Sequence, residues 1–284
     1  MSVIFATAGK PDSFGKRKFP KELPAYLAEF GLCGFEIEFG RGVRIAPSTV
    51  DFFASCSVVR FSVHAPYFIS LSSTDADVRS RSIVYIVESA VIAAAVGAER
   101  VVVHAGSCAK ISREQALELA LDTLKCARRE LDRLGLERVL ICPETMGKVN
   151  QLGTLEEVIE LCKFDERMLP CVDFGHLNAR THGGIVSRED YAAAFDKVES
   201  ALGRRRLNAL HIHFSKIEFT AGGEKRHLTF EEGDALGFGP QYKPMLDEIA
   251  ERKISPFIVC ESDGTQAEDC GEMAKYYNSI CSGG

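Results

Sequence analysis

Several apolar runs in this sequence end in ionisable side chains. The residues at the ends of these runs are His64, His104, Glu144, Asp173 with His176, His211 with His213, and Glu261. Placing such groups at the ends of buried strands costs several kcal/mol unless they are paired or bind a metal. Chance is a poor explanation for six such runs in one chain. The pattern predicts a centre that holds metal ions.

The types of donor narrow the choice of metal. Imidazoles and carboxylates without cysteine suit zinc, manganese or iron bound through nitrogen and oxygen. So many donors are too many for one ion, and crowded carboxylates raise one another's pKa unless cations compensate. His213 shares a strand face with His211, which makes it a rival ligand or a supporting partner. Taken singly, each histidine could be a satisfied core residue, and Asp173 with His176 could cap a helix.

Short apolar runs alternate with longer amphipathic stretches along the whole chain. The predicted strands are Val3–Ala8, Gly34–Phe39, Val59–His64, Arg100–His104, Arg138–Pro143, Leu169–Phe174, Leu207–Phe214 and Pro256–Cys260. The predicted helices between them are Asp75–Val96, Ser112–Leu134, Leu155–Lys163, Ser187–Leu202 and Tyr242–Arg252. Strands that are apolar on both faces pair in parallel, with helices outside.

Eight such units indicate a (β/α)8 TIM barrel, with residues 1–284 as a single domain. An open doubly wound sheet is the competitor, but no G-x-G-x-x-G follows the first strand. In a barrel the carboxyl ends of the strands meet at one mouth, which would gather the donors. The polar stretch after the seventh strand, which is flanked by Ala221–Gly223 and Glu232–Pro240, is predicted to be an active-site loop.

Composition sets the remaining limits. The formal net charge of −6 gives no global basic field, although bound cations would change the local sign at a carboxylate cluster. The ten cysteines contain no C-x-x-C pair and are predicted to be free thiols in a reducing compartment. No leader or membrane span is recognised, so we expect a cytoplasmic protein without a membrane partner, and we favour a monomer.

Seven ordered motifs between about residues 60 and 265 resemble those of the endonuclease IV family of abasic-site endonucleases. They are His64-Ala-Pro-Tyr67 with Ile69-Ser-Leu, Val103-His104-Ala-Gly-Ser107, Pro143-Glu144-Thr, Val172-Asp173-Phe-Gly-His176, His211-Ile-His-Phe-Ser-Lys216, Arg226-His227 and Cys260-Glu261. The resemblance implies a (β/α)8 barrel with a trinuclear zinc site. It also implies hydrolysis of the phosphodiester on the 5′ side of abasic sites in double-stranded DNA, a step of DNA repair.

The resemblance also implies roles for individual residues. One zinc ion would be bound by His64, His104 and Glu144. A second would be bound by Glu144, Asp173, His211 and Glu261, and the third by His176 and His227. Glu144 and Glu261 would be the catalytic carboxylates, and manganese could replace zinc. Tyr67 occupies the place of an aromatic residue that contacts DNA. Lys216, Lys225 and Arg226 lie in segments near the mouth and are predicted to contact phosphate.

The third metal site departs from the family pattern. The family has Asp-x-His after the seventh strand, whereas this chain has Lys225 at the acidic position before His227. Glu224 lies one residue earlier and could substitute if the loop shifts. Otherwise the site would hold two ions, and a leaving group would be expelled more slowly.

Two other functions fit parts of the pattern. A sugar isomerase or epimerase of the same barrel superfamily also places Glu, Asp, His and Glu on strands five to eight around one divalent ion. Such an enzyme has little need for the extra imidazoles of His64, His104, His176 and His227, which favour the nuclease. A barrel that binds metal or DNA without turnover would be expected to lack a ligand of the first two sites, and none is missing.

Overall fold

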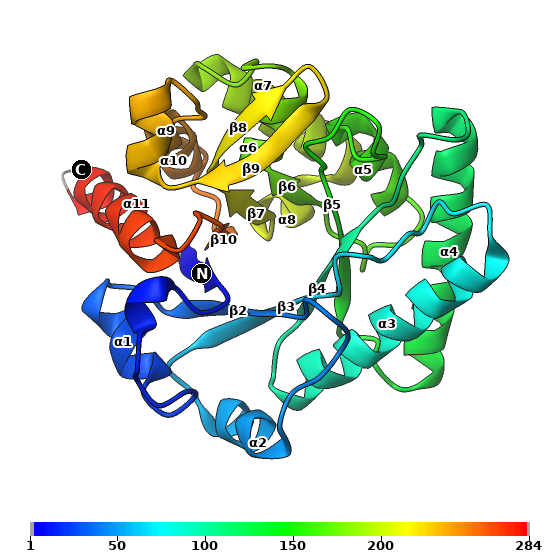
Figure 1. The fold of residues 1–284 in the computed structure, drawn as a ribbon, viewed down its shortest axis with the longest axis horizontal. Helices are drawn as coiled ribbons and strands as arrows, with labels where there is room; N and C mark the ends of the chain where they lie inside the picture. The colour runs from blue at the N-terminus through cyan, green and yellow to red at the C-terminus, as the bar shows by residue number, and fades with distance from the viewer. Residues whose placement is uncertain (1–2, 283–284) are drawn as a thin grey trace.

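The computed structural model describes residues 3–282, in which eight parallel strands close into a barrel (Figure 1). The strands are β1 (Ile4–Ala8), β2 (Gly34–Glu38), β3 (Arg60–His64), β4 (Arg100–His104), β5 (Leu140–Glu144), β6 (Cys171–Asp173), β7 (His211–Phe214) and β10 (Phe257–Cys260). Their order around the barrel is β1-β10-β7-β6-β5-β4-β3-β2. The predicted (β/α)8 TIM barrel is therefore confirmed, and each barrel strand overlaps a predicted one.

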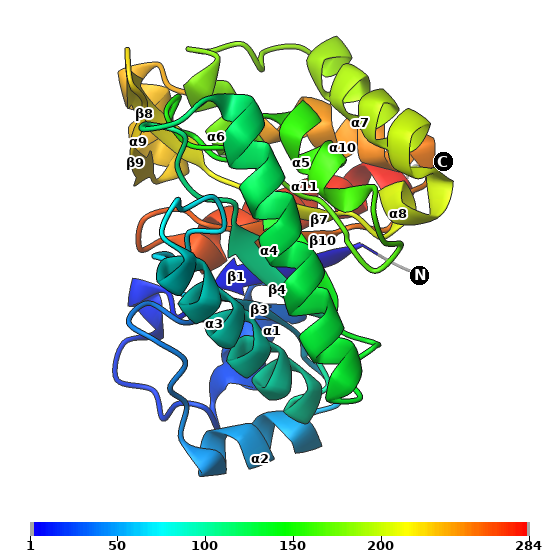
Figure 2. The same ribbon diagram turned by 90° about the vertical axis from the view of Figure 1, so that its right-hand side faces the viewer.

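Helices surround the barrel, and the two views show them on its outer side (Figures 1 and 2). They are α1 (Leu23–Glu29), α2 (Pro47–Ser55), α3 (Ala76–Ala95), α4 (Arg113–Arg133), α5 (Leu155–Cys162), α6 (Phe174–Arg180), α7 (Arg188–Leu202), α8 (Arg204–Asn208), α9 (Phe230–Leu236), α10 (Tyr242–Arg252) and α11 (Gln266–Ser282). Ser112 opens α4 and Ser187 opens α7, each in a capping box. The predicted start of the seventh strand at Leu207 is wrong, because Leu207 lies in α8.

Side chains alternate between two environments along each barrel strand. Val63, Val103 and Ile212 belong to the large apolar core that the strands share with the helices. Their neighbours point the other way, toward the barrel axis, as the period of two requires. Inside the barrel, Cys142 and Cys171 belong to a small, separate apolar cluster. The ionisable residues at the strand ends therefore project into the barrel interior and its mouth.

The segment after β7 is an antiparallel hairpin of β8 (Lys216–Thr220) and β9 (Gly223–Leu228), which Figure 1 shows in yellow. The prediction of a loop there is wrong, because backbone pairing orders both arms and α9 occupies much of the following stretch. The backbone N–H of Glu224 donates to the Gly147 carbonyl at 3.1 Å, which fixes the hairpin to the loop after β5. Gly223 has φ +87°, and a Cβ there would lie 2.2 Å from that carbonyl oxygen, so only glycine fits.

Two further expectations can be compared with the structure. All ten cysteines are free, which agrees with the prediction of thiols rather than a disulfide frame. Within residues 3–282, no helix combines the length and the apolar character needed to cross a membrane.

Candidate metal centre

Three groups of histidines and carboxylates adjoin one another at the mouth of the barrel, two at the carboxyl ends of the barrel strands and one on α6 and β9. Within each group the donor atoms lie within 4.8 Å of one another. The groups are His64, His104 and Glu144; Glu144, Asp173, His213 and Glu261; and His176, Glu224 and His227. Residues from all three line one depression of about 340 Å³. The structure thus brings together almost all of the donors that the strand ends predicted.

Glu144 lies at the junction of these groups. Its Oε2 is 3.3 Å from His64 Nε2 and 3.2 Å from His104 Nε2, while its Oε1 is 3.2 Å from His213 Nδ1. The side chain is only 1% exposed. Burial alone would raise the pKa of Glu144, but the imidazoles of His104, His176 and His213 hold this pKa well below its usual range. Glu144 is therefore an ionised carboxylate enclosed by nitrogen donors.

Three of the histidines are oriented by a contact between Nδ1 and a backbone carbonyl oxygen, and His176 Nδ1 also lies 3.3 Å from Glu144 Oε1. His64 Nδ1 lies 2.7 Å from the Ala65 carbonyl oxygen, and His104 Nδ1 lies 3.1 Å from that of Tyr67. His176 Nδ1 lies 2.9 Å from the Thr145 carbonyl oxygen. A carbonyl only accepts, so Nδ1 carries the proton, and in the neutral imidazole the lone pair of Nε2 faces the mouth. This arrangement is typical of metal-ligating histidines.

Asp173 tests whether metal ions fit these donors. Its Oδ1 accepts from the backbone N–H of His176 at 2.7 Å and caps α6, so the helix-cap explanation accounts for one oxygen. The other oxygen, Oδ2, is buried; it lies 3.2 Å from His176 Nδ1 but accepts no hydrogen bond of good geometry from any residue of 3–282. Burial raises the pKa of Asp173 to about 8; His176 opposes the shift, and Glu261 and Glu144 add to it. A cation beside Oδ2 would favour the ionised form, so the residues present fit divalent ions.

His213, and not His211, belongs to the group at the mouth. In the ladder between β6 and β7, His213 pairs with Asp173, and His211 pairs with Cys171. Two residues of strand are about 6.6 Å long, which places His211 one layer deeper in the barrel. The structure therefore brings His213 to this centre in place of the predicted His211. The period of two identifies the inward face of β7 but not the height of each residue along the barrel axis.

A β-bulge brings Glu224 to the third group. Glu218 pairs with Arg226 and Phe219 with Glu224, so Lys225 is the extra residue of β9. A bulge re-aims the side chains that precede it. Glu224 therefore lies on the same side as His227, three residues later, and its Oε2 is 3.5 Å from His176 Nε2. Although Lys225 occupies the position where an acidic residue was expected, the third donor group keeps a carboxylate, that of Glu224.

The presence of the bulge leads to a testable prediction about the metal content of a variant with a shortened β9. Deleting Lys225 should preserve the third donor group, because Glu224 and Arg226 already pair with the consecutive residues Phe219 and Glu218. We expect the deletion variant to keep its full metal content, whereas Glu224→Gln should lose one equivalent of metal. Metal content measured by mass spectrometry checks both outcomes. Loss of metal on deletion of Lys225 would contradict the role of the bulge.

The residues that were predicted to contact DNA differ in their exposure to solvent. Tyr67 is 62% exposed and pairs with the exposed ring of Phe68, with centroids 5.7 Å apart. Lys225 and Arg226 are exposed on β9, where both form ion pairs with Glu218.

Lys216 does not reach the surface. It is 1% exposed, it forms an ion pair with Asp234 of α9, and its Nζ lies 5.6 Å from the centroid of the Phe230 ring. The structure therefore does not place Lys216 at the surface, where the predicted phosphate contact would be made, because α9 covers it.

The sequence reading missed Glu36 and Glu38 of β2. Glu36 is fully buried, and its Oε2 lies 3.1 Å from His211 Nε2. Glu38 pairs in register with His64 and forms a further candidate donor group with Glu36 and Glu261. Both glutamates lie in a strand already predicted, at alternate positions. The alternation in Gly34–Glu38 was therefore the pattern that would have found them.

Comparisons with known proteins agree with this fold. A family model described as xylose isomerase-like TIM barrel matches residues 24–279. An uncharacterized protein of Methanocaldococcus jannaschii is 31% identical over 279 residues, which cover 98% of each chain. A probable endonuclease 4 of Mycoplasma pneumoniae is 30% identical over 182 residues, which cover 62% of this chain and 59% of that protein.

Solved structures of two different kinds share the fold. The structure of endonuclease IV from Thermus thermophilus matches with a TM-score of 0.64 and 20% identity, over 100% of each chain. A D-tagatose 3-epimerase-like protein matches with a TM-score of 0.68 and 18% identity, over 99% of each chain. Structural matches at these sequence identities establish only the fold. The type of reaction has to be inferred from the residues at the mouth.

Proposed function

This chain belongs to the family of xylose isomerase-like TIM barrels, and we propose that it is a metal-dependent endonuclease that hydrolyses DNA on the 5′ side of abasic sites. The observation that carries the proposal is the set of three adjoining donor groups, two of which share Glu144. Three neighbouring ions suit the transfer of a phosphoryl group, in which charge develops on several oxygens at once. The similarity to a probable endonuclease 4 and to an endonuclease IV structure supports the same activity.

The donors divide among the ions according to the groups described above. One ion would bind to His64, His104 and Glu144, a second to Glu144, Asp173, His213 and Glu261, and a third to His176, Glu224 and His227. The mixture of imidazole and carboxylate donors suits zinc, and also manganese. When bound, such ions lower the pKa of coordinated water and neutralise charge on phosphate oxygens.

The protein's own residues would position the DNA. Tyr67 and Phe68 offer exposed aromatic faces beside His104, on which a base or sugar next to the lesion could stack. Exposed Lys148 lines the depression, and Arg226 borders the neighbouring pocket beside Glu261. These cations would hold the phosphate backbone in register with the donor groups, which compensates locally for the acidic net charge.

A sugar epimerase is the second candidate, and one observation favours it. Glu144, Asp173, His213 and Glu261, from β5, β6, β7 and the end of β10, form a complete donor set for a single ion. The D-tagatose 3-epimerase-like structure shares the fold. An epimerase that uses a single ion, however, would have no use for the metal ligands of the other two donor groups. The nuclease accounts for all three groups and is therefore preferred.

Incision of a labelled duplex that carries one abasic analogue tests the proposal directly. The purified protein should cut on the 5′ side and leave a 3′-hydroxyl, and it should leave the undamaged duplex intact. Prolonged chelation should remove this activity, and zinc or manganese should restore it. If the fully metallated protein does not cut, the nuclease proposal fails, and epimerisation of ketoses should be assayed next.

A further inference from the structure

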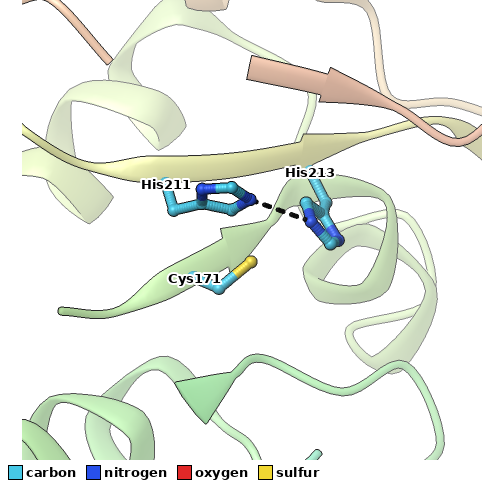
Figure 3. A group of neighbouring side chains, drawn as sticks. All are labelled: Cys171, His211 and His213. Atoms are coloured by element: carbon cyan, nitrogen blue, oxygen red, sulfur yellow. Dashed lines mark hydrogen bonds between the residues drawn. The ribbon is translucent and has the colours of Figure 1, made fainter. Parts of the chain in front are cut away.

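A fourth group of donors lies inside the barrel, one layer below the mouth. Cys171 of β6 and His211 and His213 of β7 point toward one another (Figure 3), with their donor atoms within 4.8 Å. Glu36 of β2 approaches the same two histidines from the other side of the barrel. All four residues are 0% exposed. The group is therefore closed to solvent, unlike the three groups at the mouth.

The distances within this group match those between the ligands of one ion. His211 Nε2 is 3.1 Å from Glu36 Oε2 and 3.2 Å from His213 Nε2. His213 Nε2 is 3.0 Å from Glu36 Oε1. Bond lengths of about 2.0–2.1 Å in a tetrahedral zinc site place neighbouring ligands about 3.3 Å apart. Three donors thus surround one point, with the sulfur of Cys171 beside them.

Hydrogen bonding alone does not satisfy these side chains. Ser62 Oγ donates to Glu36 Oε2 at 2.7 Å, whereas within residues 3–282 Glu36 Oε1 has only the ion-pair contact with His213 Nε2 and no hydrogen bond of good geometry. His211 Nδ1 also lacks a partner among the described residues. Between two imidazole nitrogens 3.2 Å apart there is room for only one proton. A buried carboxylate with an unsatisfied oxygen that faces nitrogen donors is what a cation would stabilise.

We propose that Glu36, Cys171, His211 and His213 bind a structural zinc-like ion inside the barrel. The neutral imidazole of His211, the imidazolate of His213, a thiolate and a carboxylate are ligands that zinc accepts, and a closed set of four is typical of structural rather than catalytic sites. On binding, the Cys171 thiol and the His213 imidazole each release one proton to solvent. The proposal does not depend on the reaction at the mouth.

His213 would connect the interior ion to the mouth. Its Nδ1 lies 3.2 Å from Glu144 Oε1 and 3.2 Å from Glu261 Oε1, whereas its Nε2 faces the interior donors. After loss of its last ring proton, His213 as an imidazolate could bind an ion through each nitrogen. The interior ion would fix the orientation of the His213 ring and so place a ligand of the mouth. It would also join β2 to β6 and β7, which are not neighbours of β2 in the barrel.

Cobalt(II) provides a test that separates this site from the mouth. The three mouth groups consist of histidines and carboxylates only, so a thiolate-to-cobalt charge-transfer band in the near ultraviolet reports a cysteine ligand. The full chain, stripped of metal and reconstituted with cobalt(II), should show this band. Crystals of the zinc form should show an anomalous difference peak between Cys171, His211 and Glu36. Absence of both from the fully loaded protein would overturn the proposal.

Matched variants identify the cysteine. Cys171→Ala should lose the band and one equivalent of metal. Cys142→Ala should keep both, although Cys142 is equally buried and belongs to the same small apolar cluster. A band that persists in Cys171→Ala would come from another thiol and would overturn the assignment. If neither variant folds, the anomalous peak of the unsubstituted protein decides. Failure of abasic-site incision would leave these readouts unchanged, so the two proposals fail separately.

Discussion

Replacing Glu144 with glutamine is expected to reduce incision of abasic DNA by about a thousandfold or more. Glu144 belongs to two donor groups, so a neutral amide would weaken two ions at once. The charge stabilisation that such ions supply is worth several kcal/mol, and about 1.4 kcal/mol corresponds to a factor of ten in rate. The rate of cleavage under single-turnover conditions, with metal in excess, measures the effect.

The control for this variant is Glu231→Gln on α9. Glu231 is exposed and lies outside the three donor groups, so the same chemical change there should leave the rate within a few fold. Metal content should fall in Glu144→Gln and stay constant in the control. A Glu144→Gln variant that keeps full activity would refute the proposed mechanism. A variant that lost metal but kept the folded state would support it.

Removal of all metal is expected to lower the melting temperature by at least about 10 °C, the effect of losing a single tightly bound ion. An ion at a thousand times its Kd stabilises the folded state by about 4 kcal/mol, and 1 kcal/mol shifts the melting temperature by about 2–4 °C. Without ions, the carboxylates of Glu144 and Asp173, which are buried, and of Glu261, which is partly buried, remain close together with less compensation. Thermal unfolding followed by circular dichroism, before and after chelation, measures the shift.

A chelator already saturated with zinc serves as the control, because it shares every other property of the reagent. Added zinc should restore the original melting temperature. An unchanged melting temperature after complete removal of metal, verified by mass spectrometry, would mean that the donors are satisfied without ions. That result would count against metal at the mouth and in the barrel interior together.

Much of this site could be predicted from local patterns. Apolar runs of strand length and their spacing predicted the barrel, since parallel strands buried on both faces leave such runs in any sequence. The donors that close those runs, such as His64, His104 and Glu144, lie where the fold brings strand ends together. These donors lie at the mouth because each stands at the end of a barrel strand, and the strand ends can be recognised in the sequence.

Other features depend on contacts that no single segment contains. Whether His211 or His213 reaches the mouth depends on the register of β7 against β6. The position of Glu224 depends on a bulge opposite Glu218 and Phe219, and α9 folds over Lys216 from a later part of the chain.

The sequence by itself thus determined the kind of fold and the chemical nature of the site. Periodicity and strand ends are local properties, because they follow from the alternation of side chains along one strand. Only the tertiary structure decided which donors share an ion and that Glu36 meets His211 across the barrel. Register and closure set those distances, and both arise from pairing between segments far apart in the chain.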